Sequence, residues 1–263
     1  MSFPRIETAE ETSRKVKEIY DSPILEIPPP QNARYPAILH VAAVYLDPSD
    51  GKYKVIKVDN KNAPRSDHDS FALNLARARV DAIITSGQVV RLEKGLTHAL
   101  QGPAPQGLQN YRSTTLDKPE TPYSLILTRK VPDLEAEIFT SKATRPIIYT
   151  STDSYNLLQG NKALKDLGIL VCDGGSSPEI EGALEYLKIL GVASISMEAG
   201  PSVANPLYKN GLVSELMLSV YRGDIQKEVI GDEFISKEEI EKDFDMLHKF
   251  ETDEWSFFRY VSK

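Results

Sequence analysis

A glycine-containing turn at residues 198–201 is the segment of the sequence with the clearest potential for chemistry. It follows the apolar run 194–197 and precedes a helical pattern that begins at Pro201, where proline leaves no N–H group unpaired. Gly200 lets a ligand approach the backbone closely, and the N–H groups and dipole of the new helix can hold a phosphate. Strand–glycine–helix turns also occur where nothing binds, and this one lacks the G-x-G-x-x-G pattern of a Rossmann dinucleotide site.

Two other strand ends carry small polar residues. The glycine-rich run 173–177 follows an apolar stretch, and its simplest interpretation is a plain turn into the helix that starts near Pro178. The alternative is a contact with the adenine end of a bound cofactor, and the same contact is open to Thr150 and Ser151 at the end of a neighbouring strand. Cys172, just before the run, is interpreted as a small buried hydrophobic residue.

Several other kinds of site lack the residues they need. The four histidines, His40, His68, His98 and His248, have no metal-ligand spacing. A single cysteine cannot form an internal disulfide, and no Cys/His cluster suggests zinc. The sequence also contains neither a G-x-S-x-G nucleophile elbow nor a Walker loop. We therefore expect no metal site.

The glycine turn belongs to a regular alternation of apolar runs and helical patterns that begins at residue 36. The run 37–44 is nearly continuous, which is typical of a central strand buried on both faces. Such alternation predicts a three-layer α/β domain with a mostly parallel central sheet and helices on both faces. The predicted strands are residues 37–44, 52–58, 81–86, 124–128, 146–150, 169–173, 194–198 and 215–221. The predicted helices are residues 66–79, 154–167, 178–190 and 201–210.

The N-terminal part of the chain differs from this alternating pattern. Residues 8–20 read as a helix, and the proline-rich run 27–30 reads as a connector because proline favours extended backbone. We therefore predict an N-terminal extension over residues 1–35 and the main domain over residues 36–263. The extension is expected to pack on this domain or on a partner subunit.

Three later segments also lie outside the alternation. Residues 101–122 are rich in Pro, Gly, Gln and Asn and are predicted to form a long loop. The acidic residues 236–248 read as a solvated amphipathic helix. Residues 255–261 are predicted to form a last strand, either at an edge or antiparallel to its neighbour.

Composition restricts the possible partners and location. The net charge of −7 makes non-specific nucleic-acid or membrane binding a poor fit, because neither surface would attract the chain electrostatically. No stretch approaches the roughly 20 apolar residues of a membrane span. The first residues are followed by acidic residues rather than an apolar run, unlike a secretory signal. We therefore expect a cytoplasmic protein.

Two motifs at close spacing resemble a known family. Residues 198–203 read E-A-G-P-S-V and residues 211–216 read G-L-V-S-E-L. Together they are similar to the E-[GA]-G-P-[TS]-L and G-L-V-D-E-L signature of the RibD C-terminal family, the riboflavin biosynthesis reductases with a dihydrofolate-reductase-like fold. The resemblance implies an NADPH-dependent reductase that forms a homodimer. It also implies that Glu198 contacts substrate and that the following residues line the cofactor, namely Gly200, Pro201, Ser202, Val203 and Ala204.

A second part of the resemblance lies upstream. Residues 75–84 are similar to the family's L-R-A-x-x-D-A-I-L. This implies that Arg77 reaches a phosphate or ribose of the substrate and that Ser66, before the same helix, also contacts substrate. Ordinary structural explanations remain open, because Arg77 could be a surface arginine and Ser66 a helix cap. Asp81 would brace the start of the next strand.

Three positions that contact cofactor or substrate in the family depart from its pattern. The cofactor-contacting Thr of the family corresponds to Val89, or to Gln88 if the gap is placed differently, and its Asp corresponds to Glu93. The substrate-contacting Arg of the family falls near Ala99. The resemblance thus implies that Val89 and Glu93 line the cofactor, and it is closer at the cofactor turn than at the substrate end.

Three functions follow as hypotheses. The first is an NADPH-dependent reductase of a small phosphorylated ribosylamino-pyrimidine, with hydride transfer to the sugar C1; Glu198 and Asp47 are the candidate acids. The second is a nucleotide-binding protein of the same fold that has lost the chemistry. The third is a dimeric interaction module that uses the N-terminal extension and residues 101–122. NADPH binding separates the first two from the third, and turnover separates the first from the second.

Overall fold

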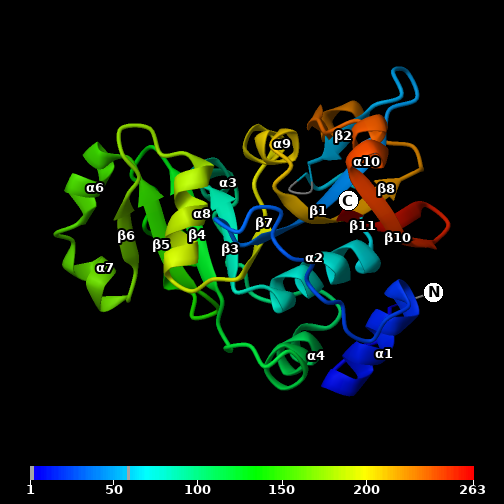
Figure 1. Ribbon diagram of the computed structural model, residues 1–263, viewed down its shortest axis with the longest axis horizontal. Helices are drawn as coiled ribbons and strands as arrows, with labels where there is room; N and C mark the ends of the chain where they lie inside the picture. The colour runs from blue at the N-terminus through cyan, green and yellow to red at the C-terminus, as the bar shows by residue number, and fades with distance from the viewer. Residues whose placement is uncertain (1–2, 58–59) are drawn as a thin grey trace.

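A mixed sheet of eleven strands forms the centre of the molecule in the computed structural model, which describes residues 3–57 and 60–263 (Figure 1). The strands are β1 (Ala37–Leu46), β2 (Tyr53–Ile56), β3 (Ala82–Ser86), β4 (Tyr123–Thr128), β5 (Arg145–Thr150), β6 (Leu170–Asp173), β7 (Ser194–Met197), β8 (Val213–Tyr221), β9 (Ile230–Glu233), β10 (Phe244–Glu251) and β11 (Trp255–Ser262). The main order is β10-β11-β8-β1-β7-β3-β4-β5-β6, and β2 pairs with β1 and β9. Every neighbouring pair from β8 to β6 is parallel, whereas β10 and β11 are antiparallel. The predicted mostly parallel sheet is confirmed.

Helices cover both faces of this sheet (Figure 1). They are α1 (Ala9–Tyr20), α2 (Asp67–Arg79), α3 (Gly87–Leu92), α4 (Pro105–Asn110), α5 (Glu137–Thr140), α6 (Thr152–Leu158), α7 (Lys162–Asp166), α8 (Ile180–Ile189), α9 (Pro201–Lys209) and α10 (Lys237–Asp243). Successive residues of a strand point to opposite faces. On β4, Leu125 accordingly joins the core under α8, while Ile126 joins the core under α6 and α7. The predicted three layers follow from this alternation.

The N-terminal segment packs on the sheet domain. Thr8 and Glu11 form a capping box that starts α1, which satisfies two N–H groups of its first turn. Val16 and Ile19 are almost fully buried in one apolar cluster with Phe71 of α2. The helix predicted over 8–20 is confirmed, while the division of the chain at residue 35 stays a prediction.

The prediction of a long loop over residues 101–122 is wrong. Its first part forms α4, with Pro105 at the first helical position, and a π-helix over Tyr111–Thr115 follows directly. Leu108 and Tyr111 are completely buried in the same cluster as α1 and α2. Tertiary burial therefore determines this structure, although the local composition favours a loop.

The prediction of a helix over residues 236–248 is wrong for the second half of this segment. Ser236 caps α10, but the helix ends at Asp243 and β10 begins at Phe244. Strand β10 pairs with β11 along its length, and that partner lies later in the sequence. The antiparallel strand predicted at residues 255–261 is confirmed as β11, but it lies inside the sheet because β10 forms the edge.

Smaller differences concern helix breaks and short elements. The helix predicted over 154–167 is two helices, α6 and α7, and Asn161 caps the second of them. Helices α3 and α5 and strand β9 were not predicted from the sequence. The strand predicted over 52–58 is observed as β2, and Val58 lies outside the described residues. Cys172 is only partly buried against the core, so its prediction as a buried residue was too strong.

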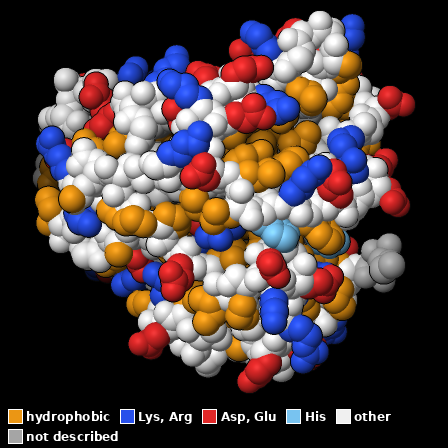
Figure 2. All heavy atoms as spheres, turned by 45° about the vertical axis from the view of Figure 1, so that its right-hand side comes forward, with side chains coloured by type: hydrophobic (Ala, Val, Ile, Leu, Met, Phe, Trp, Pro, Cys, Tyr) orange, Lys and Arg blue, Asp and Glu red, His pale blue; other side chains and the backbone are white. Residues whose placement is uncertain are grey.

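The surface and the sheet edges bear on partners. Acidic and basic side chains are interspersed around a central group of hydrophobic side chains on the face drawn in Figure 2. None of the helices in the described ranges is long and apolar enough to cross a bilayer. Strand β8 is paired on both sides, with β1 and with β11, so it has no free edge for pairing with a second copy. The homodimer stays a prediction.

Close packing between α4 and the N-terminal segment gives a first testable prediction. A Cβ at Gly107 would lie 2.7 Å from both Ile6 Cγ2 and Thr12 Oγ1. We therefore expect Gly107→Ala to lower the free energy of unfolding by about 1–3 kcal/mol, because overpacking outweighs the gain in helix propensity. Urea unfolding measures this change. Gly160→Ala, where a Cβ meets nothing within 4 Å, is the control, and equal stability of both variants would contradict the packing.

Candidate active site

The predicted glycine turn is present at the carboxyl end of β7. This strand lies between β1 and β3, and α9 begins at Pro201 immediately after the turn. The Glu198 N–H donates to the Ile84 carbonyl (2.8 Å), and the Thr85 hydroxyl donates to the Glu198 carbonyl (3.1 Å). Gly200 is the N-cap of α9, and no side chain caps this helix. The turn is therefore held by β3, and no side chain occupies the N–H groups at the start of the helix.

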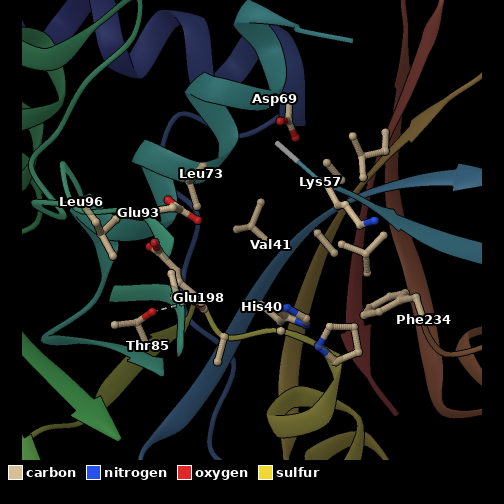
Figure 3. A pocket seen from close by; sticks show the side chains of 18 of the residues that line it. His40, Val41, Lys57, Asp69, Leu73, Thr85, Glu93, Leu96, Glu198 and Phe234 are labelled. Atoms are coloured by element: carbon tan, nitrogen blue, oxygen red, sulfur yellow. Dashed lines mark hydrogen bonds between the residues drawn. The ribbon is translucent and has the colours of Figure 1, made fainter. Parts of the chain in front are cut away.

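A cavity of about 300 Å³, here called the central cavity, opens beside this turn (Figure 3). Its walls come from β1, β2, α2, α3 and the turn itself. They are formed by His40, Val41, Ala42, Ala43, Val55, Ile56, Lys57, Asp69, Leu73, Arg77, Thr85, Val89, Glu93, Leu96, His98, Glu198, Ala199, Gly200, Pro201 and Phe234. Most of the wall is apolar, with a few polar groups, which is typical of a small-molecule site.

Arg77 and Glu198, both predicted to contact substrate, contact each other. Arg77 Nε donates to Glu198 Oε1 (2.8 Å) and Arg77 Nη2 donates to Oε2 (2.7 Å), while Nη1 donates to the Ala99 carbonyl (3.0 Å). The two side chains are only 9% and 10% exposed. Burial alone would raise the pKa of Glu198, but the Arg77 guanidinium outweighs it and holds the pKa below its usual value. Glu198 is thus a carboxylate at neutral pH.

Two histidines line the central cavity in their neutral form. Burial lowers the pKa of His40 and of His98 to about 4. His40 Nδ1 lies 2.8 Å from the Tyr208 hydroxyl, and His98 Nδ1 lies 2.8 Å from the Ser124 hydroxyl. Their uncharged rings can donate or accept a hydrogen bond toward a ligand without adding charge to the cavity.

The wall formed by α2 carries a second carboxyl group. Asp69 lies in the first turn of α2 and faces the cavity in Figure 3. Burial raises its pKa, and a hydrogen bond with Ser219 lowers it only in part. Among the described residues, Asp69 forms no ion pair with a Lys or Arg side chain. It differs in this from Glu198, which is neutralised by Arg77.

A larger cavity of about 740 Å³, here called the outer cavity, lies on the other side of the α9 N-terminus. Ser202 and Val203 line it, whereas Gly200 and Pro201 line the central cavity. Its remaining walls are formed by Ser86, Gln88, Arg91, Leu127, Thr128, Arg129, Lys130, Pro178, Glu179, Ile180, Glu181 and Pro206. The glycine turn and the start of α9 therefore separate two cavities.

Helix α3 also borders both cavities. Val89 and Glu93 line the central cavity, and Gln88 lines the outer cavity. The Ser86 hydroxyl accepts the Val89 N–H and so caps this short helix. The family's threonine corresponds to either Val89 or Gln88. Val89 faces the central cavity and Gln88 faces the outer cavity, so either correspondence gives a residue that lines a cavity.

Several predicted site residues lie away from both cavities. Ser66 caps α2 by accepting the N–H groups of His68 and Asp69, which is its ordinary structural role. Ala204 is a buried residue of α9 that faces the core, and Thr150 is buried at the end of β5. Ser151 caps α6 and donates to the Arg129 carbonyl (2.8 Å), so its connection to the outer cavity is indirect.

Two further predictions concern aspartates. Asp47, one of the candidate acids, accepts from the N–H and hydroxyl of Ser49 in the turn after β1 and does not line the central cavity. Asp81 accepts the N–H groups of Ala193 and Ser194 and pairs with Lys118, so its side chain braces the start of β7 and not that of the strand that follows it in the sequence.

Sequence reasoning missed His40, Asp69 and His98 as cavity residues. His40 interrupts a nearly continuous apolar run, which was an available signal for a functional position. Asp69 was read only as an acidic residue favourable to a helix start. His98 has a positive φ of 54°, an uncommon conformation for this residue type that the sequence does not reveal. No group of three or more metal-binding side chains is found among residues 3–57 and 60–263.

Comparisons with known proteins agree with this fold. Residues 47–222 match the family described as the RibD C-terminal domain. A search of the curated proteins gives no match.

Solved structures include a pyrimidine reductase-like protein from Corynebacterium diphtheriae, with a TM-score of 0.65 and 21% identity over 97% of this chain and 99% of that one. The riboflavin biosynthesis reductase of Saccharomyces cerevisiae has a TM-score of 0.59 and 12% identity over 97% of this chain and 100% of that one. RibD from Acinetobacter baumannii has a TM-score of 0.61 and 16% identity over 88% of this chain. The match spans only 59% of the length of that RibD. At these identities the likeness shows the fold alone.

Proposed function

The chain belongs to the RibD C-terminal domain family, and we propose that it is an NADPH-dependent reductase of a small phosphorylated pyrimidine-type substrate. The observation that carries this proposal is the glycine turn after β7, which borders both the central and the outer cavity. A Cβ built at Gly200 meets nothing within 4 Å, so the backbone is open to a ligand there. An extended dinucleotide needs such an arrangement. Its diphosphate would lie near the backbone N–H groups of the turn, and its two ends would lie in the two cavities.

The residues of the two cavities suit the two ends of the cofactor. Three exposed cations, Arg91, Arg129 and Lys130, line the outer cavity and favour a phosphorylated ribose over an unphosphorylated one. Val89 and Glu93 face the central cavity, where the nicotinamide would lie. When bound, NADPH supplies the hydride.

The protein's own residues would position the substrate and exclude water. Val41, Leu73 and Phe234 form apolar walls of the central cavity. Asp69 is the carboxyl group there whose pKa burial raises, so it suits holding a proton near the substrate better than Glu198 does. In the proposed reaction the hydride goes to the sugar C1.

The substrate class is proposed from the names of the similar structures. One is the yeast riboflavin biosynthesis reductase already described. Another, from Thermotoga maritima, is a diaminohydroxyphosphoribosylaminopyrimidine deaminase/5-amino-6-(5-phosphoribosylamino)uracil reductase, with a TM-score of 0.60 and 14% identity, of which the match spans 57%. The proposal concerns the reductase reaction on such a pyrimidine and does not include deamination.

A second candidate function is an NADPH- or nucleotide-binding protein of this fold that has lost catalysis. The pairing of Arg77 with Glu198 favours it, because both groups expected to hold the substrate are engaged with each other. Both candidates require the cofactor site, and turnover of the pyrimidine substrate distinguishes them.

Cofactor preference tests the shared part of these proposals. We expect NADPH to bind at least tenfold more tightly than NADH, since the cations of the outer cavity reward an added phosphate. The double variant Arg129→Gln/Lys130→Gln should lose most of this preference by weakening NADPH binding and leaving NADH binding nearly unchanged. Isothermal titration calorimetry measures both affinities.

A matched control removes two charges elsewhere. Lys162 and Lys165 are exposed on α7 and line neither cavity, so Lys162→Gln/Lys165→Gln should keep the preference. Equal loss of NADPH affinity in both double variants would mean that net charge, and not the outer cavity, selects the cofactor. Absence of NADPH binding to the unmodified chain would rule out the reductase, and it would leave the second candidate only as a protein that binds another nucleotide.

A further inference from the structure

A third cavity, of about 310 Å³, lies behind the Arg77–Glu198 pair and is here called the rear cavity. Arg77 and His98 line both it and the central cavity. The other walls come from residues 99–100, from α4 with the π-helix, and from residues 120–122 and 142–143. The rear cavity is therefore a neighbour of the proposed substrate site, formed largely by the segment that the sequence predicted as a loop.

Arg112 places a buried cation in the wall of this cavity. It is only 1% exposed, and it lies within the π-helix, a rare conformation that often accompanies functional sites. Burial lowers its pKa to about 10, so the guanidinium remains charged at neutral pH. In the part of the chain that the structure describes, no carboxylate lies within 4.0 Å of it.

The hydrogen bonds of Arg112 account for only part of its donors. Nε donates to the Pro119 carbonyl (2.6 Å), and Nη1 donates to the carbonyls of Ala78 (2.9 Å) and Val80 (2.6 Å) at the end of α2. This is a structural role, because an arginine can satisfy the last carbonyls of a helix. Nη2, however, is buried without a hydrogen-bond partner among the described residues. These contacts therefore use Nε and Nη1 of Arg112, but they give Nη2 no hydrogen-bond acceptor and the guanidinium no opposite charge.

The other groups around the rear cavity do not supply a buried counter-charge. Arg77 is neutralised by Glu198, and burial lowers the pKa of His98 to about 4, so this histidine is uncharged. His98 Nε2 is also buried without a hydrogen-bond partner in the described ranges. Glu120 lines the cavity but is exposed to solvent, as is the cation Lys142.

Polar side chains complete the cavity wall. Gln106, Gln109 and Thr121 add amide and hydroxyl groups. A buried charge is costly unless an opposite charge compensates it, and a guanidinium matches the geometry of a phosphate or carboxylate. The cavity has the size and the donors for an oxyanion with a small group attached.

We propose that the rear cavity binds a phosphate group, with the guanidinium of Arg112 as its buried cation. Its source is either inorganic phosphate or the phosphate ester of the ligand in the central cavity. The ester form rests on the proposed function, since it requires a substrate next to the Arg77–Glu198 pair. Arg112 would then be a ligand-binding residue in addition to the cap of α2.

Arg112 also borders a smaller cavity of about 220 Å³ together with Asp81 and Arg145. There Asp81 is already bound to Lys118 and to the N–H groups of Ala193 and Ser194. An anion in this smaller cavity would depend on Arg145, which does not line the rear cavity. An Arg145→Gln variant therefore distinguishes the two cavities.

Calorimetry with inorganic phosphate, ribose 5-phosphate and ribose on the full chain tests the proposal. We expect saturable binding of both phosphate compounds with Kd of about 1 mM or tighter, and no binding of ribose. The key variant is Gln106→Glu, which adds a negative charge to the rear wall at the first turn of α4 and leaves Arg112 in place. It should weaken phosphate binding at least tenfold, whereas Ser113→Glu, an exposed change that does not line the cavity, should not.

Arg112→Gln should abolish phosphate binding, and circular dichroism would verify that this variant folds. Tighter binding of ribose 5-phosphate than of phosphate would identify an ester as the ligand, and equal affinities would identify free phosphate; either supports the site. The inference is overturned if phosphate does not bind, if Gln106→Glu and Ser113→Glu behave alike, or if Arg145→Gln abolishes binding. Because NADPH is titrated separately, loss of phosphate binding with NADPH binding intact would refute this inference and leave the proposed function standing.

Discussion

Glu215→Gln is expected to lower the free energy of unfolding by about 3–5 kcal/mol, because it removes the carboxylate that two buried arginines share. Glu215 is completely buried on β8. Its two oxygens accept from Arg79 (2.7 and 2.9 Å) and from Arg259 (3.1 and 3.3 Å). Glutamine has nearly the same shape, but it presents an NH2 donor where Glu215 has an acceptor, so the effect combines the loss of charge with the loss of hydrogen bonds to the arginines. Urea unfolding at neutral pH gives the difference.

The same cluster predicts how stability depends on pH. Burial alone would raise the pKa of Glu215, but Arg79 and Arg259 outweigh it and hold the pKa below its usual value of 4.5. A carboxyl group with a lowered pKa in the folded state stabilises the fold above its unfolded pKa, and this contribution is lost as the pH falls. The stability difference between the unmodified chain and Glu215→Gln should therefore shrink below about pH 4.5.

A matched control for this prediction is available on α10. Glu241 is exposed, and its carboxylate forms an ion pair with Lys237 at 3.5 Å. Glu241→Gln should change the unfolding midpoint little at any pH, because exposed ion pairs contribute little. If Glu215→Gln behaved like Glu241→Gln, the cluster would not stabilise the fold.

This cluster also gives a structural meaning to the motif at residues 211–216. Arg79 donates to the carbonyls of Leu25 and Glu26, and Arg259 donates to the Glu26 carbonyl. Glu215 thus orients two arginines that bind the N-terminal connector to α2 and β11. The sequence resemblance identified the motif, but its part in holding three distant segments together depends on contacts that no local pattern reveals.

The site could be predicted where its residues are close together in the sequence. Strand, turn and helix around Gly200 all follow from local patterns of burial and capping, and the structure agrees with each of them. The relation of Arg77 to Glu198 could not be predicted in this way, because 121 residues separate them. Both line the central cavity, yet only the fold reveals that they form an ion pair.

Long-range packing also explains the predictions that were wrong. Residues 101–122 have the composition of a loop, and α4 forms there because Leu108 and Tyr111 are buried against α1 and α2. The polar residues before β10 favour a helix, but pairing with β11 determines the strand. These tertiary effects bear on function, since α4 and the π-helix form much of the rear cavity.

Gly200→Val is expected to weaken NADPH binding at least tenfold, or about 1.4 kcal/mol, while the protein remains folded. Gly200 has a φ of −63° and a ψ of 172°, which valine adopts without strain, and a Cβ there meets nothing within 4 Å. The added side chain would instead occupy the space through which a diphosphate approaches the start of α9. Calorimetry with NADPH, together with a thermal unfolding curve, measures both parts of this expectation.

Gly160→Val provides the control, because Gly160 lies between α6 and α7, and a Cβ there also meets nothing within 4 Å. This variant should bind NADPH like the unmodified chain. An unchanged affinity in folded Gly200→Val would show that the turn does not hold the diphosphate, and the cofactor would then have to lie elsewhere. A loss confined to Gly200→Val would locate the cofactor at the boundary of the central and outer cavities, as the proposed function requires.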